Sequence, residues 1–379
     1  MSMVLNEDQL MLKQSAQDFC QANAPVGELR RVRDSRDSDG FSRELWQQMV
    51  GLGWAGMAIP EEYGGFGFGY GGLEVVLEET GRNLVPSPLV ATVLLCATAI
   101  NLGGNQAQKS SLLPSIAGGE LLMALALEET AFHNPTRIEC IAERNGTGFV
   151  LNGHKTFVLD GHVADQLIVV ARTSGARDDA KGISLFLVER DAQGLNISRS
   201  EMVDSRNSAN VHLHNVQVAE EALLGELDKG YEILEKTLDV ARIGVAAEML
   251  GNAQEVFDRI IDYLKQREQF GVLIGAFQGL QHRAATMYSE LELCRSAVRR
   301  AFAELDGAQD DVPALASVAK AKLSEILGLI SNEGVQMHGG IGMTDEFDIG
   351  FYLKRARVVQ SLLGDAAFHR DRYASLNGF

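Results

Sequence analysis

Residues 239–287 read DVARIGVAAEMLGNAQEVFDRIIDYLKQREQFGVLIGAFQGLQHRAATM, which is a long helical pattern, a glycine-marked turn and the start of a second helix. In the first half, apolar residues recur every three or four positions, as on a helix with one buried face. They are Val245, Met249, Val256, Ile260, Ile261 and Leu264. The basic run 265–267 closes this helix where its dipole is negative. The stretch therefore predicts two long helices joined by a short turn, with Gln278 opening the second.

The composition predicts a globular protein of two or three domains, because 379 residues can bury a sizeable core. No apolar run is long enough to span a bilayer and the first residues do not resemble a signal peptide, so we expect a cytoplasmic protein. The four cysteines show no metal-type spacing and are expected to be reduced core thiols, and we expect no metal site. A net charge of −17 argues against nucleic-acid binding.

The hydrophobic pattern changes twice along the chain. Helical periodicity runs to about residue 119, short alternating runs separated by turns such as Asn145-Gly146 fill 120–226, and helical periodicity returns over 227–379. In the last region the expected helices are 228–266, 278–305, 313–337 and 351–372, which are long enough for an antiparallel bundle. The sequence thus predicts a mostly α fold with a central β-domain and three domains, 1–119, 120–226 and 227–379.

A glycine-rich segment lies within the first helical region. Gly67, Gly69 and Gly72 match the G-x-G-x-x-G dinucleotide fingerprint. The preceding residues 59–62 make a poor buried strand, and no βαβ unit follows. We therefore interpret the segment as a loop and not as a phosphate cradle.

Short motifs in a fixed order make the chain resemble the acyl-CoA dehydrogenase family over essentially its whole length. The motifs are Glu61-Glu62-Tyr63-Gly64-Gly65, Asn152-Gly153-His154-Lys155, Arg267-Glu268-Gln269-Phe270-Gly271, Phe277-Gln278 and Gln336-Met337-His338-Gly339-Gly340-Ile341-Gly342. The resemblance is nearest to the branch that holds the small subunit of pimeloyl-CoA dehydrogenase. It implies an N-terminal helical domain, a middle β-barrel or sandwich domain and a C-terminal four-helix bundle.

The resemblance also implies an activity. Enzymes of this family bind FAD and desaturate an acyl-CoA thioester between its α and β carbons, as in fatty-acid β-oxidation and lipid or steroid breakdown. They commonly pass electrons to an electron-transfer flavoprotein. They assemble as homo-oligomers, dimers or tetramers, or as heterotetramers with a paralogous subunit, so either assembly is expected for this chain.

By the same resemblance, the bundle supplies FAD contacts to a neighbouring subunit. The implied residues are Arg267, Phe270, Gln278, Gln336, Gly339 and Gly340. The chemistry is coherent, because an arginine fork binds phosphate and paired glycines let backbone N–H groups approach it. The alternative for Arg267 is a solvated charge at the end of a helix.

The flavin contacts implied for the β-domain differ from the family pattern. Two side-chain hydroxyls expected near the flavin are replaced by Leu127 and Leu159. Each replacement loses a hydrogen bond of about 1 kcal/mol. Phe157 could still stack on the ring, and backbone donors at 127–133 could still hold it. His133 could contact a phosphate or cap a local turn.

The catalytic base is the main departure. Leu363 occupies the position of the usual family glutamate, and Ala241 occupies the second family position, just before Arg242. Glu248 remains, two turns along the same helix. Glu248 and Arg242 are the candidate catalytic residues, because a carboxylate buried among apolar residues has the environment of a tuned base.

Alternatives to this base are open. Glu248 could instead form an interhelical ion pair, with Arg242 or with a basic residue of a neighbouring helix. Asp365 is a weaker base candidate, since Gly364-Asp365 looks like a turn or a helix start. The function predicted from sequence is an FAD-dependent acyl-CoA dehydrogenase. The alternatives are a non-catalytic partner subunit of a heteromeric dehydrogenase and, less favoured, a flavin oxidase or monooxygenase.

Overall fold

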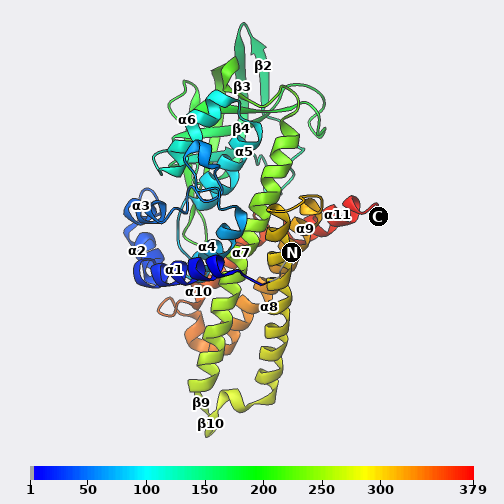
Figure 1. The fold of residues 1–379 in the computed structure, drawn as a ribbon. Helices are drawn as coiled ribbons and strands as arrows, with labels where there is room; N and C mark the ends of the chain where they lie inside the picture. The colour runs from blue at the N-terminus through cyan, green and yellow to red at the C-terminus, as the bar shows by residue number, and fades with distance from the viewer. Residues whose placement is uncertain (1–3) are drawn as a thin grey trace. The chain divides into compact units, whose positions relative to one another are not determined.

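The structure is a computed structural model that describes residues 4–379, and the chain folds into two compact units (Figure 1). The first unit comprises the described part of Met1–Asp34, Tyr70–Val85 and Arg242–Phe379, and the second comprises Ser35–Gly69 and Pro86–Ala241. The expected fold class, mostly helical with a central β-domain, is confirmed. Both units combine separate stretches of chain, so the domain boundaries drawn after residues 119 and 226 stay a prediction.

The second unit is built on a mixed sheet with the strand order β6-β7-β3-β2-β4-β5-β8, and β1 pairs with β4. Its strands are β1 (Met123–Ala126), β2 (Ile141–Asn145), β3 (Gly148–Leu159), β4 (Gln166–Arg172), β5 (Ile183–Glu189), β6 (Leu195–Glu201), β7 (Asn207–Ala219) and β8 (Leu223–Leu224). Its helices include α3 (Arg43–Gly51), η1 (Glu61–Tyr63), η2 (Leu89–Ala97), α5 (Thr98–Gly103), α6 (Gln106–Ala117) and η3 (Glu220–Ala222).

Burial explains which strands the sequence revealed. Every residue of β4 is buried, which matches its uninterrupted apolar run. The expected hairpin at Asn145-Gly146 joins β2 to β3, and Gly146 takes a positive φ of 61° there. The strands β2 and β6 were not predicted, because most of their side chains are polar and at least partly exposed.

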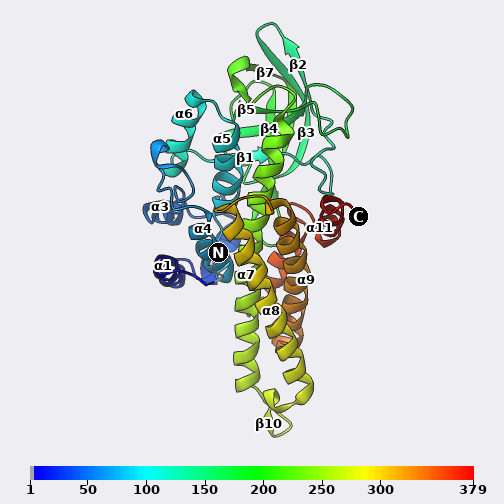
Figure 2. The same cartoon turned by 45° about the vertical axis from the view of Figure 1, so that its right-hand side comes forward.

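The first unit is helical. It contains α1 (Glu7–Asn23), α2 (Val26–Ser35), α4 (Tyr70–Arg82), most of α7 (Gly230–Gln266), α8 (Gln278–Leu305), α9 (Val312–His338), α10 (Ile349–Ser361) and α11 (Ala366–Leu376), and shorter pieces β9 (Glu268–Gln269), β10 (Val272–Leu273), η4 (Ile274–Ala276) and η5 (Gly339–Met343). The helices α7, α8 and α9 run side by side, and the small β9–β10 hairpin closes one end of the bundle (Figure 2). Asn6 and Gln9 form a capping box at the start of α1, a pattern that can be recognised from their spacing in the sequence.

The single helix expected over 351–372 is wrong, because the chain breaks at residues 362–365 into α10 and α11. Leu363 and Gly364 take positive φ angles of 57° and 105°, which a helix cannot contain. Asp365 then caps α11, since its side chain accepts a hydrogen bond from the Phe368 backbone N–H at 2.8 Å. Helical periodicity on both sides led to the prediction of one helix, although Gly364-Asp365 is itself a turn or helix-start signal.

Two expectations from composition concern the cysteines, predicted to be reduced core thiols, and membrane-spanning helices, of which none was predicted. The cysteines at 20, 96, 140 and 294 are free and buried. Burial, with a smaller contribution from Glu79, raises the pKa of the Cys20 thiol to about 12, so this thiol is not activated. No helix within residues 4–379 is both long and apolar enough to cross a membrane.

Two glycines let α4 and α7 cross in backbone contact. A Cβ atom on Gly81 would lie 2.1 Å from the Glu248 carbonyl oxygen, and one on Gly251 would lie 1.8 Å from the Glu78 carbonyl oxygen. Both distances are shorter than any packed Cβ contact, so only glycine fits at either position. This crossing fixes the centre of α7 against α4.

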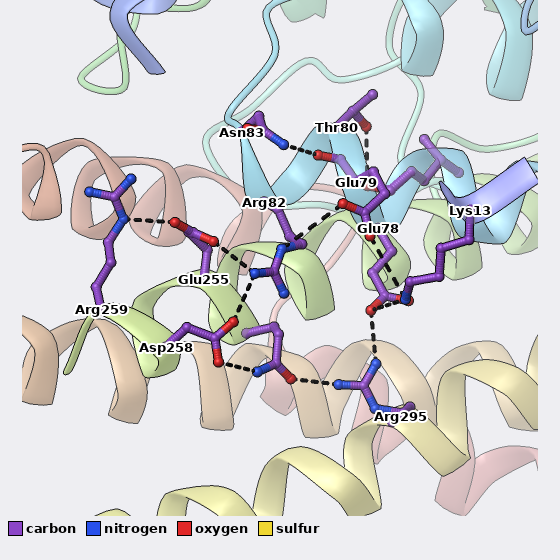
Figure 3. A network of polar contacts seen from close by, with 12 residues as sticks. Lys13, Glu78, Glu79, Thr80, Arg82, Asn83, Glu255, Asp258, Arg259 and Arg295 are labelled. Carbon is purple, nitrogen blue, oxygen red and sulfur yellow. Dashed lines mark hydrogen bonds and ion pairs between the residues drawn. The ribbon is translucent and has the colours of Figure 1, made fainter. Parts of the chain in front are cut away.

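Buried charges surround the crossing. Glu78 is 3% exposed and lies 3.0 Å from the Lys13 ammonium and 2.8 Å from the Arg295 guanidinium (Figure 3). Burial alone would raise the pKa of Glu78, but these two cations hold it below its ordinary value. Arg82, one turn further along α4, donates a hydrogen bond of 2.8 Å to Asp258 of α7. The ion pairs thus satisfy the charges of Glu78 and Arg82, whereas Glu79 of the same helix keeps one buried carboxylate oxygen without a hydrogen bond within residues 4–379.

We predict that Gly251→Ala lowers the free energy of unfolding by about 1–3 kcal/mol, because the new methyl group forces α4 and α7 apart. Urea unfolding followed by circular dichroism measures the effect. The matched control is Gly27→Ala in α2, where a Cβ atom meets nothing within 4 Å, and this variant should be neutral or slightly stabilising. Equal unfolding midpoints for the two variants would contradict the crossing.

Candidate functional site

The residues implied as FAD contacts of the bundle lie together at one end of the first unit. The α7 helix ends at Gln266, the β9–β10 hairpin follows, and α8 begins at Gln278. At the same end α9 finishes at His338, whose ring lies 4.5 Å from that of Tyr263 in the last turns of α7. Segments that are far apart in the sequence therefore meet at this bundle tip (Figure 2).

The polar side chains of the bundle tip point to solvent. Arg267, Gln278 and Gln336 are exposed. Within residues 4–379, the Arg267 guanidinium takes part in none of the ion pairs or side-chain hydrogen bonds, so its five donors are available to an anion from outside the chain. Phe270 is 91% exposed at a positive φ of 55°, and although its ring meets that of Phe277 edge-on with centroids 6.2 Å apart, most of its apolar surface faces solvent.

The glycines of the bundle tip leave open space. Gly339 and Gly340 follow α9 in η5, and a Cβ atom on either would meet nothing within 4 Å. Neighbouring Gly339 takes a positive φ of 63°, so its backbone is turned as only glycine allows cheaply. An exposed arginine and an open glycine segment at the same end of the bundle suit the pyrophosphate of a dinucleotide. By this test the bundle tip fits part of an FAD molecule.

In the β-domain the residues implied as flavin contacts differ in their exposure to solvent. Phe157 sits at a register shift between β3 and β7, takes a positive φ of 50° and is 51% exposed, so its ring face is free to stack. Leu127 is buried and Leu159 half-buried, and neither side chain can donate a hydrogen bond. His133 has a side chain only 4% exposed, with Nδ1 2.5 Å from a Glu128 carboxylate oxygen.

This arrangement favours the structural alternative for His133. The ring is engaged with Glu128 inside the protein and is not presented to a phosphate. The β-domain therefore fits FAD mainly through Phe157 and through backbone groups, and it is a poorer half-site than the bundle tip.

A buried lysine that sequence reasoning quoted only as part of a motif holds this part of the β-domain. Lys155 is fully buried and donates to the Leu127 carbonyl oxygen at 3.1 Å and to a Glu129 carboxylate oxygen at 2.7 Å. The Glu129 carboxylate also accepts hydrogen bonds from the backbone N–H groups of Glu139 and Cys140. One ion pair thus closes the base of the 130–138 loop. A lysine within an apolar strand pattern was the available signal.

Glu248, the candidate base, forms a two-pronged ion pair with Arg355 of α10. The Arg355 Nε atom donates to Glu248 Oε1 at 2.9 Å and Nη2 donates to Oε2 at 3.0 Å. The two residues are only 3% and 4% exposed. The interhelical ion pair that the sequence left open is therefore present. A carboxylate held by two charge-assisted hydrogen bonds is a weak proton acceptor, so this geometry does not support the catalytic role.

Arg355 was missed in the sequence, although a signal existed. It lies among Tyr352, Ala356 and Val359 on the buried face of α10, where a cation needs a partner. Two buried opposite charges on different predicted helices are candidates for pairing, but the pairing itself depends on the packing of α7 against α10.

The turn at 362–365, which carries the usual base position, is held by donors from three helices. Leu363 is 6% exposed, and its carbonyl oxygen accepts from His369 Nε2 of α11 at 3.0 Å and from Arg242 Nε of α7 at 3.4 Å. Lys320 of α9 donates to the Gly364 carbonyl oxygen at 2.9 Å. The Arg242 side chain thus contacts a backbone carbonyl oxygen of the turn. Asp365, the weaker base candidate, is engaged as the cap of α11.

Lys320 itself was not predicted. It is fully buried, and its ammonium also lies 3.2 Å from the Gln360 carbonyl oxygen and 3.4 Å from Ser324 Oγ. Burial, followed by the charge of Arg242, lowers the pKa of Lys320 to about 7. The two carbonyl oxygens and the Ser324 hydroxyl oxygen all accept hydrogen bonds from this nitrogen, so the buried group has three partners.

Three sequence models match the chain in succession. They are the N-terminal, middle and C-terminal domains of acyl-CoA dehydrogenases, which match residues 6–120, 124–216 and 228–375. The three matches follow the order of helical, β and helical segments in the structure.

Individual relatives cover nearly the whole chain. It is 33% identical to the mitochondrial isovaleryl-CoA dehydrogenase of Pongo abelii, over 97% of this chain and 88% of that protein. It is 30% identical to subunit CarC of the caffeyl-CoA reductase-Etf complex of Acetobacterium woodii, over 94% of each. The solved structure of a steroid acyl-CoA dehydrogenase named for two proteins, Tcur3481-Tcur3483, superimposes with a TM-score of 0.88 at 33% identity over 98% of each chain.

The matched domains, the near-complete relatives and the shared fold agree with one another. The chain belongs to the acyl-CoA dehydrogenase family of FAD-dependent oxidoreductases.

Proposed function

We propose that this chain is the base-lacking subunit of a heteromeric acyl-CoA dehydrogenase, and that its bundle tip completes the FAD site of a partner chain. The observation that carries the proposal is that neither candidate position offers an unengaged carboxylate. Leu363 fills the usual base position, and Glu248 is committed to Arg355. Desaturation needs a carboxylate that removes the α-proton of the thioester, so that carboxylate belongs to the partner.

In this proposal the chain's own residues bind and orient. Arg267 binds a phosphate oxygen of FAD, while Gly339 and Gly340 bring backbone N–H groups to the same group. Gln278 and Gln336 donate further hydrogen bonds, and Phe270 buries its exposed ring against the partner. When bound, FAD accepts the hydride that leaves the β carbon of the acyl group.

The proposed substrate is a bulky or dicarboxylic acyl-CoA. The branch resemblance to the small subunit of pimeloyl-CoA dehydrogenase supports this class, and so does the steroid acyl-CoA dehydrogenase among the relatives. An electron-transfer flavoprotein is the proposed electron acceptor, since one relative is a subunit of a reductase-Etf complex. A homo-oligomeric dehydrogenase that uses Glu248 is the competing reading, and the experiments below separate the two.

The first prediction concerns the ion pair. Arg355→Met should lower the free energy of unfolding by about 3–5 kcal/mol, because it removes the two charge-assisted hydrogen bonds that hold the buried Glu248 carboxylate. The double variant Glu248→Met with Arg355→Met should regain most of that loss, as judged by urea unfolding. If the two single effects simply add, the side chains are not coupled and Glu248 is free for another role.

The second prediction concerns the cofactor. Purified alone, the chain should hold little FAD, and co-expression with a base-bearing family subunit should give a yellow complex. In that complex Arg267→Ala in this chain should lower the FAD content, measured by absorbance after gel filtration, because a phosphate contact is lost. Arg283→Ala, a change in a cation of α8 that pairs with Glu333, is the control and should retain FAD.

A full complement of FAD on the isolated chain, bleached by an acyl-CoA, would overturn the base-lacking assignment. In that case Glu248→Gln decides between the remaining readings. Loss of bleaching with FAD retained would identify Glu248 as the base, and unchanged bleaching would point to another group.

The third prediction concerns the vacant position. In the yellow complex, whose base-bearing chain has had its own catalytic glutamate changed to glutamine, Leu363→Glu in this chain should not damage FAD binding. It should restore slow bleaching by acyl-CoA only if this chain lines a complete active site. We expect no restoration, because the β-domain half-site has lost two hydroxyls at Leu127 and Leu159. Restored turnover at more than a few per cent would contradict the proposed division of labour.

A further inference from the structure

Two histidines lie side by side on the exposed face of the β-domain sheet. His154 of β3 and His212 of β7 are direct partners in the antiparallel pair. Both are exposed, their ring centroids are 4.4 Å apart and their planes are inclined by 34°. Neither residue takes part in the candidate flavin site described above.

The pairing register makes this arrangement a property of the backbone. Directly opposed residues of an antiparallel pair have Cβ atoms roughly 4.5–5.5 Å apart. Two imidazoles on such a base can turn their nitrogens toward one point without moving the strands. A bound ion would lie roughly 2.0–2.1 Å from each nitrogen.

Burial and neighbouring charge favour the neutral, metal-binding form of His154. Burial, and then the neighbouring His212, lowers the pKa of His154 below its ordinary value. Lys155 acts in the same direction, whereas Glu129 acts in the opposite one. Near neutral pH the His154 ring therefore keeps a lone pair for a ligand, with little competition from protons.

We propose that His154 and His212 form a two-imidazole chelate for a late divalent transition ion, such as Zn²⁺, Ni²⁺ or Cu²⁺. Imidazole nitrogens suit these ions, and Mg²⁺ or Ca²⁺ would not bind, because both prefer oxygen ligands. Such a site cross-links β3 and β7. Its occupation stabilises the β-domain, since the ion binds the folded register and not the unfolded chain.

Water or another molecule completes the coordination. His214 lies two residues along β7 and is also exposed, but a register shift between Leu151 and Gly153 interrupts the pairing there. Its Nε2 atom lies 3.4 Å from the side-chain nitrogen of Asn215. Among residues 4–379 no group of three histidine, cysteine or acidic side chains is placed to hold one ion.

No pattern within the sequence indicated this site. The spacing of its cysteines indicated no metal, and the two histidines are far apart along the chain. Only the register of β3 against β7 brings them together.

The test is titration of the full-length, untagged chain, treated with a chelator and then dialysed, with Ni²⁺ in an isothermal calorimeter. We expect one site, and His154→Gln and His212→Gln should each weaken it by roughly a hundredfold, because a chelate becomes a single contact. The melting temperature should rise with Ni²⁺ in the natural chain and not in these variants. The control is His282→Gln, which removes an exposed histidine of α8 and should change nothing.

Cu²⁺ titration followed by electron paramagnetic resonance gives a second readout, since two nitrogen ligands should be visible in the natural chain and one in either variant. His214→Gln distinguishes a two-ligand site from a three-ligand site, and little change is expected. Failure of the natural chain to bind either ion, or an affinity in His154→Gln or His212→Gln equal to that of the natural chain, would overturn the proposal. Circular dichroism of the variants excludes misfolding as the cause.

Discussion

The ion pair between Glu248 and Arg355 is the constraint on which the helical unit depends. A carboxylate in the middle of α7 would be costly in the core without a cation, and Arg355 supplies one through two hydrogen bonds. The pair fixes α10 against α7. Because the turn at 362–365 directly follows α10, this contact also positions the turn. On the opposite side, the glycine crossing holds α7 against α4. The carboxylate that could have served chemistry is thereby used in packing.

The turn at 362–365 remains shaped although its catalytic side chain is gone. Leu363 holds a left-handed backbone conformation that costs roughly 1–2 kcal/mol in a residue other than glycine. His369, Arg242 and Lys320 offset this cost by donating to the carbonyls of Leu363 and Gly364. Strain that several buried donors maintain is typical of functional turns. A simple connection between α10 and α11 could have used glycine or asparagine and relaxed.

Much of the fold could be predicted from local patterns, because each of those features is written within a few residues. The 3.6-residue periodicity of α7, the capping box at Asn6 and the hairpin glycine at 146 are all of this kind. The break between α10 and α11 was missed because apolar periodicity continues across it. The partners of Glu248 and of His154 were not readable at all, since each pairing depends on which helix or strand lies opposite. Residue chemistry marks a group that needs a partner, and only packing chooses that partner.

The family's site residues that this chain lacks and those that it keeps belong to different halves of the flavin site. The hydroxyls at Leu127 and Leu159 and the base at Leu363 would all serve a flavin and substrate held by this chain itself. The exposed Arg267 and the open glycines at 339 and 340 would serve a flavin held by a neighbour. Random decay of an unused site would remove both groups alike. The presence of the outward-facing group alone supports the proposal that this chain contributes to a flavin site on another subunit, with Glu248 serving as a structural charge.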